Sequence, residues 1–516
     1  MKALLMHRDR DFDEDQPLPW NTSDMTQDLD LKTLLRAMAG DDKFLFEVSR
    51  KVLLCGARND IETVRYRQEV LKDCLQNPEV IHELYAIVVD TLDRTRKQTW
   101  GITSHYPSSV LYSATDLLET LTVMLRKLRD TCLAHASKFR SEAFQALFTM
   151  LAKELTDEYL AAIQDHLTIS RFRKGTLMSA QLGQHNESTS LVLRKAPDRK
   201  QKWFERLLRK RPPGYTFELH ERDETGARIF GEIRHRAISK VAVALAESAD
   251  HVVSFFQMLR TELAFYVACT NLYATLLDKG ERVCFPTPVP AGERNHHFRK
   301  LYDVCLSLRM EQKIVSNTLD EDGKDLVTIT GANQGGKSSF LRSVGVAQLM
   351  LQCGMFVGAE QFEGELCSAL LTHYKREEDA SMQSGKFDEE LSRMNQIVAH
   401  IGRNAMVLFN ESFAATNERE GSEIARQIVT ALLEKRVRVF YVTHLYEFAR
   451  GFFEKRREDA LFLRAERQPD GSRTFQLSVA EPLETSYGED LYREIFEEVD
   501  EAISSPPISR IPATAD

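Results

Sequence analysis

A glycine-rich run ends in adjacent Lys337 and Ser338, at the spacing used by phosphate-binding loops. It matches G-x-x-x-x-G-K-[ST] and lies between an apolar, strand-like segment and a helix-like segment. Glycines let backbone N–H groups surround a phosphate, and the start of the next helix adds a positive field. We therefore expect Lys337 to hold the outer phosphates and the Ser338 hydroxyl to bind Mg²⁺. The predicted phosphate-binding residues are Gly331, Ala332, Asn333, Gln334, Gly335, Gly336, Lys337, Ser338 and Ser339.

Two further apolar runs end in polar side chains that could complete a hydrolytic site. Residues 405–409 precede Asn410 and Glu411, and residues 437–443 precede His444. In phosphate-binding-loop ATPases such strand ends carry a metal-side acid and the group that positions the attacking water. We expect Glu411 to orient and deprotonate water, and His444 to contact a γ-phosphate or that water. The alternatives are that Asn410 and Glu411 only cap the next turn, and that His444 is structural.

The predicted magnesium ligands are the oxygen atoms of Ser338, Asn410 and Glu411. Asn410 stands where an Asp is expected, so a neutral oxygen replaces a charge near the metal. We therefore expect lower metal affinity or slower turnover.

The elements that must position these residues follow from hydrophobic periodicity. Between Pro107 and Pro197 there is no proline, and apolar residues from Leu111 to Cys132 recur at three-and-four spacing, which predicts long helices. A second stretch without proline covers residues 214–285 and contains apolar residues at the same helical spacing. After about residue 290, short apolar runs alternate with helical stretches, which is typical of a parallel α/β sheet. The predicted fold class is mixed: an α-helical region with a small inserted segment, followed by an α/β domain with a mainly parallel sheet.

The segment between the two helical reaches has a different composition. Residues 216–232 read as two short strands around a turn at Thr225-Gly226. Residues 191–211 contain nine basic and two acidic side chains, with Trp203 and Phe204 among them. This run could bind DNA phosphates or could simply be a solvated helix face. The candidate DNA contacts are Arg199, Lys200, Lys202, Arg206, Arg209 and Lys210.

Length, charge and cysteine usage limit the class of protein. The 516 residues allow two to four domains, and a net charge of −9 excludes a chain-wide basic field. The eight cysteines are scattered without a CxxC pair, which argues against a zinc site or a disulfide framework and favours a reducing cytoplasm. No stretch approaches the roughly 18 apolar residues of a membrane span, and the N-terminus lacks the apolar region of a signal peptide. We expect a cytoplasmic protein without a membrane partner.

In their order along the chain, these motifs resemble the ATPase domain of the MutS family of DNA mismatch-repair proteins, a branch of the ABC-type ATPases. The family's TGPNxGGKST stretch is similar to TITGANQGGKSSFLRSVG, and its next strand and turn to GMFVGAE. Its Walker B and dimer-contact loop is similar to LFNESFAATNEREG, its switch-histidine strand to YVTHLYEF, and its KSYG element to ETSYG. Upstream, residues 60–67 resemble a short core-domain motif, and the long helices around an insertion resemble the family's lever and clamp.

The predicted domain organisation combines these patterns with the resemblance. It has an N-terminal segment at 1–27, a helical core and lever domain at 28–170, an inserted clamp-like basic segment at 171–236, a returning lever helix at 237–290, a MutS-type phosphate-binding-loop ATPase domain at 291–500 and a disordered tail at 501–516. The core-like segment begins near Asp28, so we expect the chain to lack the family's mismatch-reading domain and its connector domain. We therefore expect DNA shape or backbone to be recognised rather than a mispair.

The resemblance implies ATP and Mg²⁺ as cofactors and two ATP sites at a homodimer interface. Asn317 matches the family's asparagine beside the adenine, while aliphatic Ile314 or Val315 replaces the aromatic adenine contact before it. The family's serine that reaches the partner's ATP is replaced by Gly385, with Ser384 one position away.

The expected function is ATP hydrolysis at a dimer interface, coupled to binding of structured or branched duplex DNA in mismatch repair or recombination. Association with the nucleoid would follow from DNA binding. One alternative is a nucleotide-gated scaffold that hardly hydrolyses ATP and acts through a protein partner. Another is the nucleotide-binding subunit of a membrane transporter, against which the missing LSGGQ-like signature and the long helical N-terminal half both argue.

Overall fold

The computed structural model describes residues 1–98, 106–172, 175–184, 188–194, 218–220, 222–376, 385–468 and 472–484. Contacts divide the chain into two compact units. The first contains Met1–Leu5, Asp9–Phe12 and Asn77–Leu263, and the second contains Met6–Arg8, Asp13–Gln76 and Ala264–Asp516. The domain bounds expected from the sequence stay a prediction, because this division rests on contacts alone.

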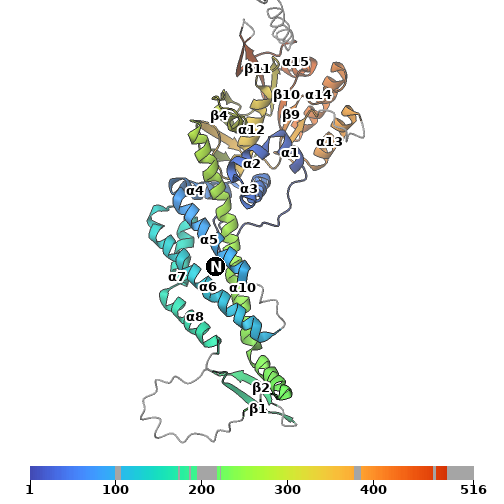
Figure 1. The fold of residues 1–516 in the computed structure, drawn as a ribbon. Helices are drawn as coiled ribbons and strands as arrows, with labels where there is room; N and C mark the ends of the chain where they lie inside the picture. The colour runs from blue at the N-terminus through green and yellow to red at the C-terminus, as the bar shows by residue number, and fades with distance from the viewer. Residues whose placement is uncertain are drawn as a thin grey trace, which may run out of the picture. The chain divides into compact units, whose positions relative to one another are not determined.

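The first unit is mainly helical (Figure 1). Helix α6 starts with Pro107, where the fixed φ of proline suits a first turn. It buries Leu111, Leu121 and Cys132 along one stripe, so the predicted long helix is confirmed. The elements of this unit are α5 (Pro78–Gln98), α6 (Pro107–His135), η3 (Ala136–Lys138), α7 (Glu142–Glu154), α8 (Asp157–Ser170), the hairpin of β1 (Met178–Leu182) and β2 (Ser188–Leu193), and helix α10 (Glu224–Asp278) as far as Leu263.

Helix α10 corrects one prediction. The two strands expected within residues 216–232 are wrong for the described residues from Glu224 onward, which are helical. The Asp223 carboxylate accepts a hydrogen bond of 2.8 Å from the Gly226 N–H, as a helix N-cap does. The Thr225-Gly226 pair therefore lies in the first turn of a helix and not between two strands. Residues 195–217 lie outside the described residues, and with them most of the basic run at 191–211 and all six candidate DNA contacts.

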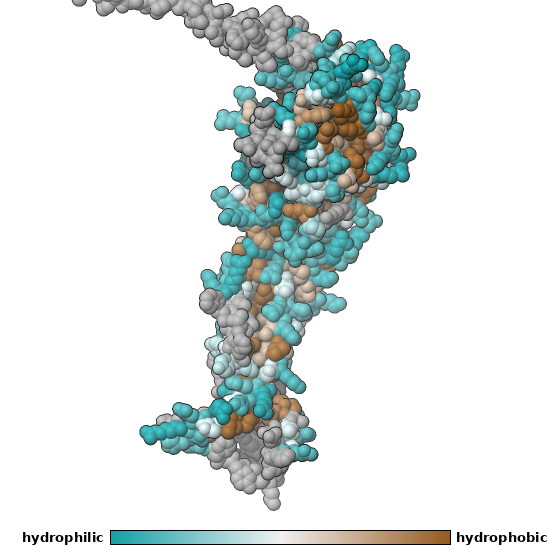
Figure 2. All heavy atoms as spheres, turned by 90° about the vertical axis from the view of Figure 1, so that its right-hand side faces the viewer, coloured by the Kyte–Doolittle hydropathy of each residue, from teal (hydrophilic) through white to brown (hydrophobic). Residues whose placement is uncertain are grey.

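By length and composition, α10 is the one helix in the described part of the chain that could cross a membrane, which the sequence analysis does not predict. However, 67% of its apolar 18-residue window is buried inside the protein, as in the core helix of a globular domain. Hydrophilic side chains cover most of the face drawn in Figure 2, around a concentrated apolar area in its upper part.

The second unit contains two sheets. The six-stranded sheet has the order β12-β11-β6-β10-β9-β8, in which β12 alone is antiparallel to its neighbour. The four-stranded sheet has the order β3-β7-β4-β5 and is mostly antiparallel. The prediction of a mixed fold with a mainly parallel sheet is confirmed. The strands are β3 (Thr287–Val289), β4 (His296–Leu301), β5 (Asn317–Asp320), β6 (Leu326–Gly331), β7 (Gln361–Glu365), β8 (Leu370–Tyr374), β9 (Met406–Asn410), β10 (Arg438–Val442), β11 (Ala460–Arg467) and β12 (Arg473–Val479).

Helices cover both faces of the six-stranded sheet, which explains its continuous apolar strands. On one face, Phe409 and Tyr441 belong to a core cluster with residues of α13, α14 and α15. On the other face α12 contacts β8, β9 and β10, and Gly345 of α12 allows the Leu408 side chain to approach closely. The helices of this unit are α1 (Thr22–Asp28), α2 (Leu31–Ala39), α3 (Lys43–Cys55), η1 (Gly56–Arg58), α4 (Ile61–Gln76), α10 from Ala264, α11 (Val304–Arg309), α12 (Lys337–Gln352), α13 (Lys386–His400), α14 (Glu418–Glu434) and α15 (Tyr446–Glu454).

Candidate functional site

Three loops meet at the carboxyl edge of the six-stranded sheet. Strand β10 lies between β6 and β9 and is parallel to both, so the three strands end side by side. The Glu411 N–H donates to the Val442 carbonyl at 2.9 Å, and the Thr443 N–H donates to the Ile329 carbonyl at 3.1 Å. In open parallel sheets ligands bind at this edge. The structure therefore brings the glycine-rich loop, Glu411 and His444 together, as the sequence predicts.

The glycine-rich loop needs its glycines for space and for backbone angle. A Cβ on Gly331 would lie 2.8 Å from the Ala465 nitrogen, and a Cβ on Gly335 would lie 2.7 Å from the Ala465 Cβ. Gly331 and Gly336 have φ values of 107° and 86°, which favour glycine. Gly336 is the N-cap of α12, whose first N–H groups have no acceptor within the helix. The loop is thus a backbone cradle of the kind that binds phosphate.

Lys337 is buried at the start of α12, where its ammonium group donates to backbone carbonyls. Its Nζ atom donates to the carbonyl oxygens of Gly331 at 3.0 Å and Ala332 at 2.8 Å. Burial lowers the pKa of Lys337 to about 8, which Glu411 opposes and Arg473 reinforces. A buried ammonium is stabilised by a nearby anion. Lys337 therefore lies where its ammonium group can bind a phosphate in the loop, and such an anion would stabilise its charged form.

Ser338 and Asn410 supply neighbouring oxygens beside this loop. The Ser338 hydroxyl donates to Asn410 Oδ1 at 3.1 Å. With the Glu411 carboxylate, these groups form a set of oxygen donors of the type that Mg²⁺ prefers. The donor set fits a magnesium ion, although two of its three members are neutral.

Glu411 has an unusual backbone and a defined partner. Its φ is 55°, in the left-handed region that a non-glycine residue rarely adopts. Its Oε1 atom lies 3.0 Å from His444 Nε2, and this hydrogen bond is the main cause that lowers the pKa of Glu411, against burial. Glu411 is thus ionised at neutral pH and can accept a proton from water.

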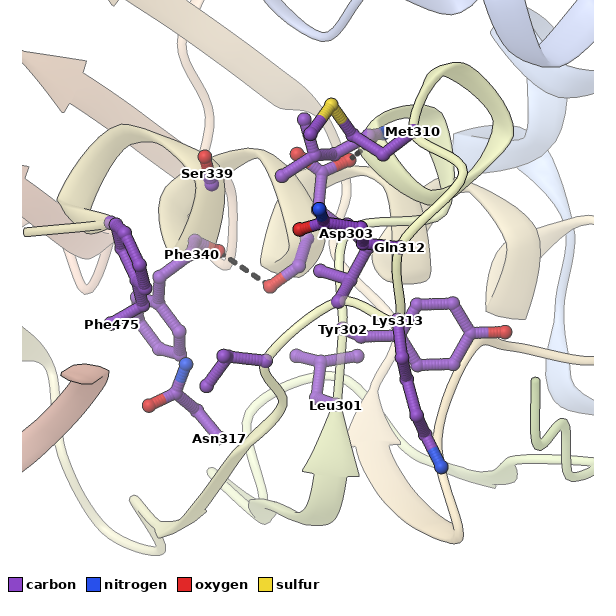
Figure 3. A pocket seen from close by; sticks show the side chains of 15 residues that line it. Leu301, Tyr302, Asp303, Met310, Gln312, Lys313, Asn317, Ser339, Phe340 and Phe475 are labelled. Atoms are coloured by element: carbon purple, nitrogen blue, oxygen red, sulfur yellow. Dashed lines mark hydrogen bonds between the residues drawn. The ribbon is translucent and has the colours of Figure 1, made fainter. Parts of the chain in front are cut away.

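A pocket of about 410 Å³ adjoins the glycine-rich loop at Gly336 and Ser339. In Figure 3, Phe475 of β12 lies on one side of it, and Met310, Gln312 and Lys313 lie on the other. Ile314 and Val315, the predicted aliphatic contacts, also line it. Its position beside the phosphate loop and its apolar walls suit the base of a nucleotide.

Asn317 and Phe475 show what sequence reasoning found and missed here. Asn317 lines the pocket, and its Oδ1 accepts a hydrogen bond of 2.8 Å from the Leu477 N–H. It therefore fixes β12, which carries Phe475. The contact of Asn317 with an adenine stays a prediction. Phe475 was not predicted, and its only signal in the sequence is one aromatic residue between polar Thr474 and Gln476.

The predicted dimer-contact position is only partly described. Ser384 lies outside the described residues. Gly385 is the N-cap of α13 and has no side-chain cap. No atom of the described residues lies within 4 Å of a Cβ built at Gly385. Its role toward a partner subunit stays a prediction.

Two protein-family models match separate parts of the chain. The family model of the MutS2 N-terminal domain matches residues 59–279, and that of MutS domain V matches residues 327–493. The DNA mismatch repair protein MutS of Thermus caldophilus is 30% identical over 230 residues, which is 45% of this chain and 27% of that protein. MutS protein homolog 4 of Mus musculus is 24% identical over 249 residues, 48% of this chain and 24% of that protein. The matches therefore span about a quarter of these relatives' lengths.

Proposed function

Because the chain belongs to the MutS family, we propose that it binds and hydrolyses ATP with Mg²⁺ at the carboxyl edge of its six-stranded sheet. One observation carries this proposal. Buried Lys337, the Ser338–Asn410 pair and the Glu411–His444 pair lie together around a backbone cradle. The name MutS, which the relatives carry, adds support.

The phosphates would lie in the cradle of residues 331–339, with Lys337 exchanging its carbonyl partners for phosphate oxygens. The base would enter the pocket between Phe475 and the aliphatic side chains of Ile314 and Val315. Ser338, Asn410 and Glu411 would hold Mg²⁺, which when bound neutralises charge on the phosphate oxygens.

The hydrolytic step assigns one proton transfer to this chain. Glu411 accepts a proton from water as the water oxygen bonds to the γ-phosphorus and the bond to the leaving phosphate oxygen breaks. His444 holds the Glu411 carboxylate in place and is near enough to contact the γ-phosphate. Because Asn410 adds no charge beside the metal, turnover is expected to be slow.

Dimer formation and DNA binding extend the proposal beyond the described site. ATP would be enclosed between two copies of the chain, each site completed by the partner's signature segment at Ser384 and Gly385. The DNA ligand would be a structured or branched duplex, in repair or recombination, and the candidate contacts are the six basic residues between 199 and 210. The eight free cysteines agree with a cytoplasmic location.

The decisive experiment is ATP turnover by the purified protein, alone and with duplex, mismatched, looped and four-way-junction DNA. Glu411→Gln serves as the blank, because it keeps the shape of the side chain and removes the base. We expect turnover above this blank, stimulated by one DNA form. Turnover equal to the blank throughout would refute hydrolysis and favour the nucleotide-gated scaffold.

A sizing experiment tests the dimer. The Glu411→Gln protein should bind ATP without consuming it, so its mass by light scattering should double on addition of Mg²⁺-ATP. An unchanged monomer mass at saturating ATP would contradict a site completed by a partner subunit.

A further inference from the structure

His373 is a fully buried histidine that the proposed ATP chemistry does not use. It lies on β8 opposite Phe409 of β9, next to the strand end that carries Asn410. Its ring stacks on Phe413, with centroids 5.3 Å apart and planes 22° from parallel. The side chain is 0% exposed, so both ring nitrogens must find partners inside the protein.

The partners of the ring determine where its proton lies. Nε2 is 3.0 Å from the Glu390 backbone carbonyl, which can only accept, so Nε2 carries the proton. Burial lowers the pKa of His373 to about 4, so the ring is neutral and Nδ1 must accept. The hydroxyl of Ser412, 2.7 Å from Nδ1, is therefore the donor there. The same hydroxyl lies 2.5 Å from the His373 carbonyl oxygen, so its proton serves two acceptors.

Because Glu390 is on α13, these hydrogen bonds join α13 through His373 to Ser412, the residue that follows Glu411. The Glu390 side chain, also on α13, accepts a hydrogen bond from the Phe413 N–H. The Tyr441 hydroxyl of β10 donates to the Ser412 carbonyl at 2.9 Å. The loop after the proposed base is thus held by α13, β8 and β10 at once.

The backbone of this loop needs such support. Glu411 and Phe413, on either side of Ser412, have φ values of 55° and 62°. Each costs free energy in a non-glycine residue and persists only where surrounding contacts hold it. Without the His373–Ser412 contact, we expect the segment to relax and the Glu411 carboxylate to move.

We propose that His373 and Ser412 are positioning residues. They link the loop that carries Glu411 to helix α13 and so hold the Glu411 carboxylate in place. This inference rests on the proposed function, in which Glu411 is the base. A displacement of α13, whose first turn follows Gly385, is then passed to the base of the same chain. The hydrolytic rate thereby becomes sensitive to whatever contacts the start of α13.

The kinetic test compares His373→Ala, His373→Gln and Ser412→Ala with wild type. Because a misplacement of about 1 Å can cost about 100-fold in rate, we expect His373→Ala to lower kcat by about 10- to 100-fold. The KM for ATP should change by less than about 3-fold, since no nucleotide contact is lost. Glutamine, which offers one amide donor and one acceptor, should restore part of kcat. The double variant His373→Ala/Ser412→Ala should lose no more than the worse single variant.

His296 offers a matched control. It is also 0% exposed, and among the described residues its ring has one polar partner, Glu321, but it lies on β4 of the other sheet. His296→Gln should leave the kcat of folded protein near that of wild type. Equal losses in kcat for His296→Gln and His373→Gln, or a rise in KM that accounts for the loss in His373→Ala, would overturn the proposal.

A second measurement separates this inference from the proposed function. Hydrogen exchange at the Phe413 amide should be faster in His373→Ala than in wild type, and unchanged in His296→Gln. If wild type shows no turnover above the Glu411→Gln blank, the proposed hydrolysis is refuted. The link between His373 and α13 is then tested by hydrogen exchange at the Phe413 amide alone. Faster exchange in His373→Ala then supports the link to α13, whereas equal exchange refutes it.

Discussion

Replacing Phe475 by alanine should weaken the binding of ATP and ADP by the same factor, if the pocket beside Gly336 holds the nucleotide base. Phe475 is 46% exposed and lines this pocket from β12, so a face of its ring is open to a ligand. Its φ is 58°, a conformation that alanine adopts at no greater cost than phenylalanine. Loss of the ring should therefore affect the ligand more than the fold.

The magnitude follows from the composition of the pocket walls. Stacking of a base on an aromatic side chain contributes about 1–3 kcal/mol by alanine substitution. Only one face of the base would stack here, because the other aromatic lining residues, Tyr302 and Phe340, are 4% and 3% exposed and Ile314 and Val315 supply aliphatic contacts. We expect a loss near the lower end, about 1.5 kcal/mol, which raises Kd by about 10-fold. The ratio of ATP to ADP affinity should not change, because the ring does not contact the γ-phosphate.

The assay is an equilibrium titration of both nucleotides in a Glu411→Gln background, where ATP is not consumed. Val479→Ala is the matched control, since Val479 is 69% exposed on the same strand and does not line the pocket. The reasoning would be refuted by a Phe475→Ala protein whose Kd for ATP stays within about 2-fold of its parent. A loss of ATP affinity without a loss of ADP affinity would equally contradict a base contact.

Three further predictions concern charge. Asn410→Asp should lower the Mg²⁺ concentration for half-maximal turnover by roughly 10-fold, because a carboxylate replaces a neutral ligand; an unchanged Mg²⁺ requirement would remove this residue from the metal site. Lys337→Met should abolish ATP binding, yet should raise the urea midpoint at pH 7, since burial holds the pKa of Lys337 to about 8 and so penalises the charged form. His373 has a folded pKa of about 4 against about 6.5 when unfolded, so the unfolded state binds more protons between these values and stability falls with acidification. Between pH 7 and pH 5 wild type should lose about 2 kcal/mol more than His373→Gln in urea denaturation, and parallel losses would contradict a neutral buried ring.

The sheet edge was predictable because its determinants are local. Strands β6, β9 and β10 are short apolar runs buried on both faces, and each ends directly at the polar residues in question. The glycine-rich loop joins β6 to α12 without an insertion. Parallel pairing alone then brings the three strand ends together.

Other parts of the site could not be read from local sequence. Phe475 reaches the pocket only because β12 pairs with β11 and is fixed at Leu477 by Asn317, which lies 160 positions before Leu477. His373 looks like an ordinary apolar-strand histidine until tertiary packing places it against Ser412. The prediction of a turn between two strands at Thr225-Gly226 was wrong for a different reason. Turns and helix N-caps use the same residue types, so the sequence alone does not distinguish them.

The contact between Ser338 and Asn410 bears on the order in which ligands enter. In the free protein these two candidate metal ligands bind each other at 3.1 Å, and neither carries a charge. To bind without nucleotide, a magnesium ion would have to lose part of its hydration shell and break the Ser338–Asn410 hydrogen bond. In return it would gain two neutral oxygens and the Glu411 carboxylate, which is already hydrogen-bonded to His444. The phosphates of ATP supply the missing negative charge, and they also neutralise buried Lys337. Magnesium and ATP should therefore bind as one complex, and the affinity for Mg²⁺ should depend on nucleotide more strongly in this chain than in its Asn410→Asp variant.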